Sequence, residues 1–296
     1  SSVDKAVRIA GLGSDNLVKI GVDKQFAMVP DQLEEAIKKD FNKGMKPMAV
    51  VAALGTTGTT AVDPVGRIGK ICNKYGLWLH IDAAYAGTAL MLDSKSHYRT
   101  GIEMADTFVF NPHKWMFTNF DCSAYFVRDR DALVRTFSIL PEYLKTAEGD
   151  RVNNYRDWGI ALGRRFRALK LWFVMRSFGV EGLKKKVSDH IRWAEDLKET
   201  ILEDRNFELM APVPFATLCF RLHPPDIHED HRLNTMNSRL METLNREGKL
   251  YLTHTKLNGK FTLRLVIGQT RQEKRHIDEA WNRIRETASL ILSENF

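Results

Sequence analysis

The chain has 296 residues, of which 44% are hydrophobic and 27% charged, so it can bury the core of one large or two medium domains. It has no apolar run of membrane-spanning length and only three widely spaced cysteines, which argues against a membrane partner and a disulfide framework and suggests a cytoplasmic protein. The net charge is +7, but the cations are spread along helical stretches without a nucleic-acid-binding motif, so we expect no nucleic-acid partner.

Apolar runs alternate with amphipathic stretches through the first half of the chain, in the way that strands alternate with helices. We expect strands at 16–22, 48–54, 77–82, 106–110 and 122–127, and helices at 30–43 and 64–75. Strands and helices in this order predict an α/β domain, with a mostly parallel sheet flanked by helices.

From about residue 160 the pattern changes to that of a smaller α+β domain. We expect helices at 160–178 and 180–203, hinged at Gly179, then strands at 207–210, 217–222, 250–255 and 261–267, with helices at 230–247 and 272–292. We place the domain boundary in the linking helices near residue 175. This gives a large domain of residues 1–175 and a small C-terminal domain of residues 176–296.

Polar residues gather where three of the predicted strands end. The Gly/Thr-rich run 55–60 follows one strand, Asp82 ends the next, and Thr107 with residues 111–114 flanks the end of a third. Because parallel sheets bind ligands beyond the carboxyl ends of their strands, these groups should lie together. Each also has a bland interpretation, as an ordinary turn or a helix cap, but their joint occurrence favours a site.

Lys114 and Asp82 are the two side chains that a pyridoxal phosphate site requires. A lysine amine holds the aldehyde of the cofactor covalently, and a carboxylate keeps the pyridine nitrogen protonated so that the ring accepts electrons. The sequence therefore predicts a pyridoxal phosphate site at this edge of the sheet.

Five sequence blocks, in the same order, resemble those of one known family. They are Leu-Gly-Thr-Thr at 54–57, His-Ile-Asp-Ala-Ala-Tyr-Ala-Gly at 80–87, Asn-Pro-His-Lys-Trp at 111–115, Asn-Phe-Asp-Cys-Ser at 119–123 and Leu-Gly-Arg-Arg-Phe-Arg-Ala-Leu-Lys at 162–170. Through these blocks the chain is similar to the aromatic L-amino acid decarboxylases, which are group II pyridoxal phosphate enzymes of fold type I. The resemblance implies a large domain like that of the pyridoxal phosphate-dependent transferases.

The resemblance implies specific roles for the residues at the strand ends. Lys114 binds the cofactor covalently and is displaced by the substrate amine, and Asp82 pairs with the pyridine nitrogen. Ala84 packs flat on the cofactor ring, and Thr57 lines the cofactor. A buried carboxylate beside a cation favours the charged forms of both, which suits the role of Asp82.

Further positions match the family's phosphate-binding and catalytic residues. Thr107 and Asn111 match phosphate-binding positions, where a hydroxyl and an amide suit a dianion. His113 resembles the family's active-site histidine, with a histidine packed in a turn as the alternative. Tyr143, in the loop at 140–150, matches a tyrosine that protonates the α-carbon of the substrate after carbon dioxide leaves, with a surface contact as the alternative.

The implied activity is the decarboxylation of an aromatic L-amino acid to its amine and carbon dioxide, in a homodimer with shared active sites. Alternatives on the same fold are an aldehyde synthase and a histidine decarboxylase; the alternative of another class is an inactive scaffold or fragment. Related aldehyde synthases carry phenylalanine where Tyr143 stands, so this tyrosine favours decarboxylation. Gly163 matches a position where plant relatives use glycine for indoles, but it does not decide the substrate.

The family's chain extends further at its N-terminus than this sequence does. Three features of the family's additional part have no counterpart in this sequence: a helical segment used in dimer packing, a small-residue loop that binds much of the phosphate, and a histidine that stacks on the pyridine ring. We therefore expect residues 1–296 to function only together with an upstream segment of the same protein.

One further cluster, at residues 223–231, contains three histidines and three carboxylates. Such side chains can ligate a metal ion. The two prolines and the high charge are more typical of an exposed loop before a helix, so we expect no metal site.

Overall fold

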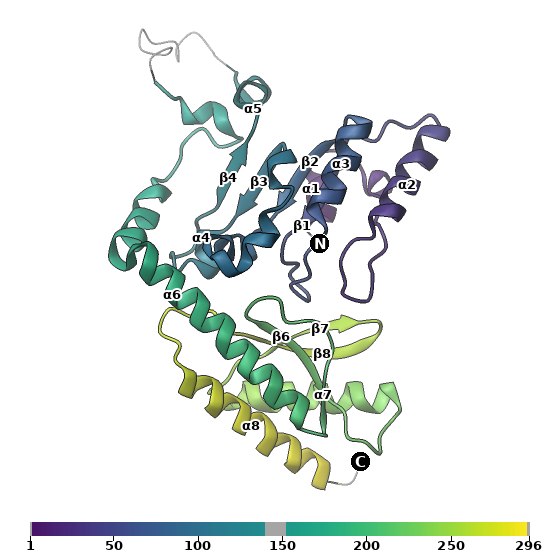
Figure 1. Ribbon diagram of the computed structural model, residues 1–296, viewed down its shortest axis with the longest axis vertical. Coiled ribbons are helices and arrows are strands. Elements are labelled where there is room, and N and C mark those ends of the chain that lie inside the picture. The colour runs from purple at the N-terminus through teal and green to yellow at the C-terminus, as the bar shows by residue number, and fades with distance from the viewer. Residues whose placement is uncertain (1, 140–151, 295–296) are drawn as a thin grey trace.

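The computed structural model describes residues 2–139 and 152–294. Figure 1 shows two units, each built around its own sheet, with the long helix α6 (Arg167–Glu203) running beside both. Within these described ranges, no helix is both long and apolar enough to cross a membrane.

The first sheet has the order β1-β2-β3-β4, from strands Ala49–Ala53, Trp78–Asp82, Thr107–Phe110 and Ala124–Val127. Strands β1, β2 and β3 are parallel, and β4 is antiparallel to β3. Ala52, Leu79 and Ile81 are fully buried on one face of this sheet, and the alternate residues Val51 and His80 on the other face are half-buried. The predicted mostly parallel sheet is confirmed.

Helices α2 (Pro30–Asn42) and α3 (Val65–Tyr75) form where helical spacing of apolar residues predicts them. Ile68 and Cys72 are buried on α3, which packs between α2 and the strands β1 and β2. Gly76 ends α3 in the left-handed conformation, with φ of 65°, which glycine adopts without steric cost.

The segment before α2 differs from the prediction. Residues Ser2–Ile9 form a helix, α1, that the sequence patterns do not indicate, and Ser14–Asn16 form a short 3₁₀ helix. The strand expected at 16–22 is wrong, because its one β contact in the described structure is a bridge between Val22 and Met28. Val18 and Val22 are 50% and 55% exposed, so the alternation there does not mark a buried face.

Short helices connect the strands of the first unit. Three 3₁₀ helices between β2 and β3 span Ala86–Met91, Asp93–Arg99 and Ile102–Met104. The helix α4 (Pro112–Trp115) follows β3, and α5 (Arg130–Phe137) follows β4. Beyond the undescribed residues 140–151, Tyr155–Trp158 form another 3₁₀ helix.

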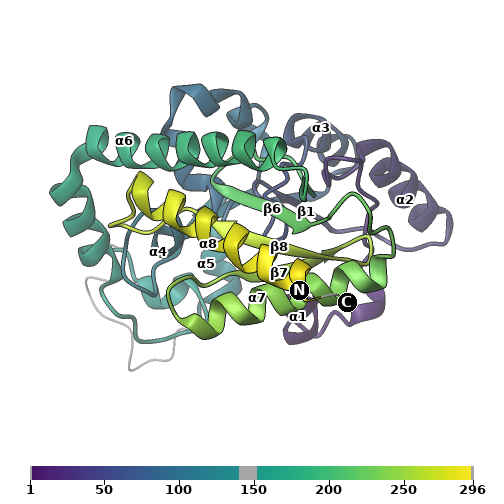
Figure 2. The ribbon, with the colours of Figure 1, turned by 90° about the horizontal axis from the view of Figure 1, so that it is seen from below.

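The second unit has an antiparallel sheet with the order β5-β6-β8-β7. These strands span, in chain order, Phe207–Leu209, Thr217–Leu222, Thr253–Leu257 and Lys260–Val266. Helices α7 (Asp230–Glu247) and α8 (Lys274–Ser293) cover the sheet face that points away from the first unit (Figures 1 and 2). The smaller α+β unit at the C-terminal end is therefore confirmed.

Helix α6 begins at Arg167, seven residues later than expected. Residues 160–166 are not helical, and they include Gly163, which disfavours a helix. Gly179, with φ of 66° and ψ of 173°, interrupts α6 where the hinge is predicted. The domain boundary near residue 175 lies in the first part of α6 and stays a prediction.

Candidate cofactor site

Four of the predicted site residues are joined by hydrogen bonds at the carboxyl edge of the first sheet. Asp82 ends β2, and its Oδ1 accepts a hydrogen bond from the backbone N–H of Ala84 at 3.0 Å. The carbonyl of Ala84 accepts from the N–H of Asn111 at 3.0 Å, and the carbonyl of Asn111 accepts from the N–H of Lys114 at 2.8 Å. The structure therefore brings Asp82, Ala84, Asn111 and Lys114 together, as the strand-end rule predicts.

The side chains of Lys114 and Asp82 have unused bonding capacity. Lys114 is exposed, and its amine has no hydrogen bond or ion pair with any described residue. Asp82 is half-buried, and in the described part of the chain its Oδ2 accepts no hydrogen bond. An available amine and an available carboxylate oxygen are what pyridoxal phosphate needs for its aldehyde and its ring nitrogen, so these residues fit the cofactor.

Asn111 also has donors to offer. Its Oδ1 accepts a hydrogen bond from the hydroxyl of Ser123 at 2.7 Å, which leaves the two hydrogens of its amide nitrogen without a partner among the described residues. Asn111 precedes α4 and does not cap that helix with its side chain. An amide held in this way can donate to an anionic group.

The residue after Lys114 fixes the position of α4. Trp115 is fully buried, and its ring stacks on Tyr85 with a centroid distance of 4.8 Å and an interplanar angle of 8°. Its Nε1–H donates to Nδ1 of His190 on α6 at 3.1 Å. The hydroxyl of Thr217 on β6 donates in turn to the phenol oxygen of Tyr85 at 3.4 Å.

Burial sets the ionisation of the two groups that hold Trp115. It raises the pKa of the Tyr85 phenol well above its usual value. Burial lowers the pKa of His190 to about 4, helped by the nearby Lys186 and opposed by Asp189. His190 is therefore neutral near pH 7 and can accept the hydrogen bond from Trp115.

His113 is held by a neighbouring backbone segment. Its Nδ1 lies 2.5 Å from the carbonyl oxygen and 3.0 Å from the backbone nitrogen of Cys122. Its ring also meets Phe120 edge-on, with a centroid distance of 4.8 Å. These contacts fix the ring beside Lys114, and its active-site role stays a prediction.

The loop after β1 is shaped by its glycine and threonines. Gly55 has φ of 87°, and a Cβ placed there would lie 2.5 Å from Cβ of Ala86, so glycine is needed for this close approach. The hydroxyl of Thr56 accepts from the N–H of Ala61 at 3.1 Å. Thr57 is exposed, so its hydroxyl remains available for a ligand.

Thr107 does not join these residues. It is the first residue of β3 and pairs with His80, two residues before Asp82. Its buried hydroxyl lies 2.9 Å from Nδ1 of His80 and 3.1 Å from Nε1 of Trp78. The expectation that Thr107 flanks the carboxyl end of the strand is wrong, because the strand begins rather than ends there. Its hydroxyl is engaged within the sheet.

Tyr143 and the loop at 140–150 lie outside the described residues, so the predicted role of Tyr143 stays a prediction.

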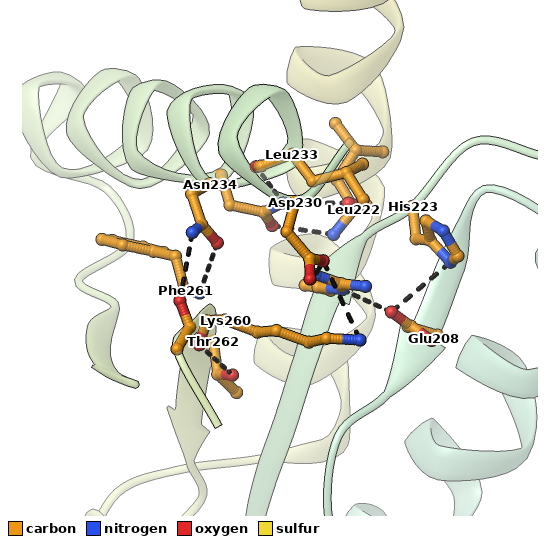
Figure 3. Close-up of polar contacts among 12 residues, drawn as sticks. Glu208, Leu222, His223, Asp230, Leu233, Asn234, Lys260, Phe261 and Thr262 are labelled. Atoms are coloured by element: carbon orange, nitrogen blue, oxygen red, sulfur yellow. Dashed lines mark hydrogen bonds and ion pairs between the residues drawn. The ribbon is translucent and has the colours of Figure 1, made fainter. Parts of the chain in front are cut away.

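In the histidine-rich segment 223–231, His223 and Asp230 contact side chains that lie outside the segment. Across the described ranges, no group of three or more His, Cys, Asp or Glu residues is arranged to hold a metal ion. His223 Nδ1 lies 3.4 Å from Glu208 (Figure 3). Asp230 accepts a hydrogen bond from the guanidinium of Arg221 at 3.0 Å. That hydrogen bond lowers the pKa of Asp230.

Two residues that contact segments next to the site were not identified from the sequence. His190 appears in the sequence as an isolated histidine on a helix, and Arg264, whose Nε–H donates to the carbonyl of Gly58 at 2.9 Å, as a charged residue within an apolar strand. A polar or charged side chain within an otherwise apolar strand or helix face is the signal that could have found them, because such a group needs a partner once the element packs.

Residues 1–223 match the family model described as the pyridoxal-dependent decarboxylase conserved domain. The chain is 43% identical over 296 residues to a phenylacetaldehyde synthase of Arabidopsis thaliana, covering 99% of this chain and 60% of that protein. It is 42% identical over 299 residues to tryptophan decarboxylase 2 of Oryza sativa subsp. japonica, again covering 99% of this chain and 60% of the relative.

A crystal structure of Oryza sativa TDC with PLP and tryptamine matches the fold with a TM-score of 0.95 at 36% identity, over 98% of this chain and 61% of that one. The chain thus spans about 60% of the length of the curated relatives that it matches. The comparisons confirm the predicted cofactor, pyridoxal phosphate. Since the family model matches most of its residues, the chain belongs to the pyridoxal-dependent decarboxylases.

Proposed function

We propose that the whole protein decarboxylates an aromatic L-amino acid to the corresponding amine and carbon dioxide. The observation that carries this proposal is the hydrogen-bonded set Asp82–Ala84–Asn111–Lys114, which presents an amine and a carboxylate oxygen without protein partners among the described residues. Bound pyridoxal phosphate supplies a ring that accepts the electrons of the bond between the α-carbon and the carboxylate.

Each residue of the set has a defined task in this reaction. Lys114 would hold the cofactor through its amine until the substrate amine takes its place, and Asp82 would keep the ring nitrogen protonated. Ala84 offers a flat contact to the ring, and Thr57 and Asn111 donate hydrogen bonds to the cofactor. The protein thus contributes orientation and electrostatics to the reaction.

Two more residues complete the proposed chemistry. His113, fixed by Cys122 beside Lys114, lies in the active site. Tyr143 delivers the proton to the α-carbon after carbon dioxide leaves, and its loop excludes water from the site.

A second candidate is an aldehyde synthase, because the relative that is 43% identical carries that name. Product analysis separates the two activities when the intact protein is incubated with tryptophan, tyrosine, phenylalanine, dihydroxyphenylalanine and histidine. A decarboxylase yields amine and carbon dioxide, whereas an aldehyde synthase consumes oxygen and water and yields aldehyde, ammonia and hydrogen peroxide besides carbon dioxide. Formation of aldehyde and peroxide without amine would contradict the first candidate. The tyrosine at position 143 supports decarboxylation.

We further propose that the protein is a cytoplasmic homodimer with shared active sites. The first half of α6, at the side of the molecule in Figure 1, carries four large apolar residues that are 42–58% exposed: Leu169, Trp172, Phe173 and Met175. Exposed apolar residues on one short stretch are typical of a surface that another chain covers. In this proposal, a second copy of the chain covers the apolar surface on the first half of α6.

An additional segment of the same protein completes the first unit in this proposal. The outer strands β1 and β4 each pair with one neighbour in the described structure, and Tyr125 and Phe126 on β4 are at least half exposed. A groove of about 750 Å³ lies along α1, α2 and β1, lined by apolar residues such as Val7, Leu33 and Val50. In this proposal, strands of the additional segment pair with the open edges of β1 and β4, and its helices pack in the apolar groove.

The need for that segment is testable with residues 1–296 alone. We expect this piece to bind pyridoxal phosphate at least tenfold more weakly than the intact protein, as measured by titration of the visible absorbance. Equal affinity and turnover would show that the further segment is dispensable.

A further inference from the structure

The sheet of the second unit has one face toward its helices and one toward the cofactor site. On β6, Phe220 meets Trp281 of α8 with a ring distance of 6.0 Å. The alternate residues Thr217 and Cys219 instead contact Tyr85 and the carbonyl of Gly58 in the first unit. Since strand residues alternate between faces, a polar row of β6 and its neighbours borders the site.

Arg264 lies on this polar face and reaches the loop after β1. It pairs with Cys219 and Thr253 on the neighbouring strands. Its Nε–H donates to the carbonyl of Gly58 at 2.9 Å, and its Nη1–H donates to the hydroxyl of Thr253 at 3.0 Å. The thiol of Cys219 donates to the same Gly58 carbonyl at 3.3 Å.

Gly58 belongs to a loop with a strained backbone. Gly55 and Thr60, near its two ends, have φ of 87° and 58°. A threonine in the left-handed region is unfavourable and persists where its surroundings hold it in place. Arg264 and Cys219 lie outside this loop, and both donate to the carbonyl of Gly58. Gly58 directly follows Thr57, which lines the cofactor in the proposed function.

Arg264 is suited to holding the carbonyl of Gly58 because its charge is not paired with a carboxylate of a described residue. A charged donor makes a stronger hydrogen bond to a carbonyl than a neutral donor does. Its planar guanidinium also holds Thr253 at the same time, so the donor has a fixed direction.

We propose that Arg264 is a positioning residue of the cofactor site: from the C-terminal sheet it holds the Gly58 carbonyl and thereby fixes the loop that carries Thr57. The consequence for cofactor binding rests on the proposed function. Arg264 thus connects the C-terminal unit to the site without itself contacting the cofactor.

Arg221 provides a matched control. It lies on β6, two residues after Cys219, and is almost fully buried. Its guanidinium pairs with Glu208 and Asp230, both within the second unit. Replacing Arg221 therefore disturbs the same sheet without removing a contact to the loop.

The test compares Arg264→Met, Arg264→Lys and Arg221→Met in the intact protein. Amide hydrogen exchange is followed in the cofactor-free protein at residues 55–62, where Thr60 and Ala61 donate hydrogen bonds within the loop. Pyridoxal phosphate affinity is measured by titration of the visible absorbance. We expect Arg264→Met to speed exchange in the loop and weaken the affinity, each at least tenfold. Arg264→Lys should recover part of both losses.

Three results would overturn the proposal: unchanged loop exchange in Arg264→Met, faster exchange without weaker cofactor binding, or an equal effect of Arg221→Met on the loop. Failure of the proposed function looks different. In that case the unmodified protein binds no pyridoxal phosphate, while the exchange comparison still decides whether Arg264 holds the loop.

Discussion

Lys114 and Trp115 are adjacent residues with opposite environments. The lysine is exposed and its amine has no partner among the described residues, whereas the tryptophan is fully buried. Helix α4 has only four residues and cannot hold its own position. The stacking of Trp115 on Tyr85 and its hydrogen bond to His190 therefore determine where the amine of Lys114 lies.

Replacing Trp115 with phenylalanine tests this anchor. The change removes the donor to His190 and leaves a buried acceptor without a partner, so we expect a loss of about 2–3 kcal/mol in the free energy of unfolding. Urea unfolding measures it. The control is Tyr251→Phe, which removes a hydroxyl at a position that is 79% exposed, and a change of less than about 0.5 kcal/mol is expected there. Equal effects of the two changes would contradict the anchoring role.

His190 makes stability depend on pH. Burial lowers its pKa in the folded protein to about 4, from an ordinary value of 6.5. Below about pH 6.5 the unfolded chain takes up a proton that the folded protein refuses, so stability falls as the pH decreases toward 4. The total loss from this residue is about 3 kcal/mol, with stability retained above pH 6.5.

Urea unfolding at several pH values between 7.5 and 4.5 measures this loss. His190→Asn keeps an acceptor for Trp115 but cannot be protonated, so the variant should show a shallower decline than the unmodified protein. Identical declines would show that other groups cause the pH dependence.

At the scale of elements, sequence periodicity predicts a strand or helix correctly where one side of the segment is buried in the structure. Residues 217–222 and 230–247 form the expected strand and helix without a shift, because each buries one apolar face or stripe in the second unit. The residues 16–22 alternate in the same way but bury no face, and no strand forms. Sequence periodicity does not reveal whether a neighbouring strand is present.

Part of the site could be predicted from the order and direction of the strands. Strand order places Asp82, Asn111 and Lys114 at one edge, and this follows from the parallel arrangement alone. Thr107 was assigned to the wrong end of β3: the strand forms almost where it is predicted, and Thr107 is its first residue rather than a residue at its carboxyl end. The contributions of His190 and Arg264 come from chain segments more than 70 residues away from their partners, so local patterns do not show them.

Gly55 tests how closely the loop after β1 must approach the next element. In Gly55→Ala, the new Cβ would lie 2.5 Å from Cβ of Ala86 at a residue with φ of 87°. We expect a loss of about 2–4 kcal/mol in unfolding free energy, from both backbone strain and overlap.

The matched control is Gly44→Ala, because Gly44 has φ of 74° but open space around it. Backbone strain alone should cost about 1 kcal/mol there. If thermal or urea unfolding gives the same loss for both variants, the overlap with Ala86 does not matter.

At the scale of the whole molecule, the cofactor site depends on both units. The first unit supplies Asp82 at the end of β2 and Lys114 on α4, while α6 and the second sheet contact the neighbouring segments through His190, Thr217 and Arg264. The exposed apolar residues on the first half of α6 and the open edges of the first sheet are the surfaces that the proposed homodimer and the proposed additional segment would cover.

Phe173→Glu tests the proposed dimer surface on α6. Phe173 is 58% exposed, so a charge there should cost little in the monomer but should be excluded from an apolar interface. Sedimentation of the intact protein should shift from dimer to monomer. Leu202→Glu, at a 56% exposed position near the other end of the same helix, should remain dimeric. A dimer in both variants would place the interface elsewhere.

The central claim is that Lys114 forms the covalent bond to pyridoxal phosphate. Borohydride reduction of the intact protein with the bound cofactor, followed by peptide mass spectrometry, tests it most directly. We predict the added mass of the reduced cofactor on the peptide that contains Lys114, and its loss in Lys114→Ala but not in the exposed-lysine control Lys24→Ala. The added mass on a different lysine, or on none while the cofactor is bound, would contradict the account.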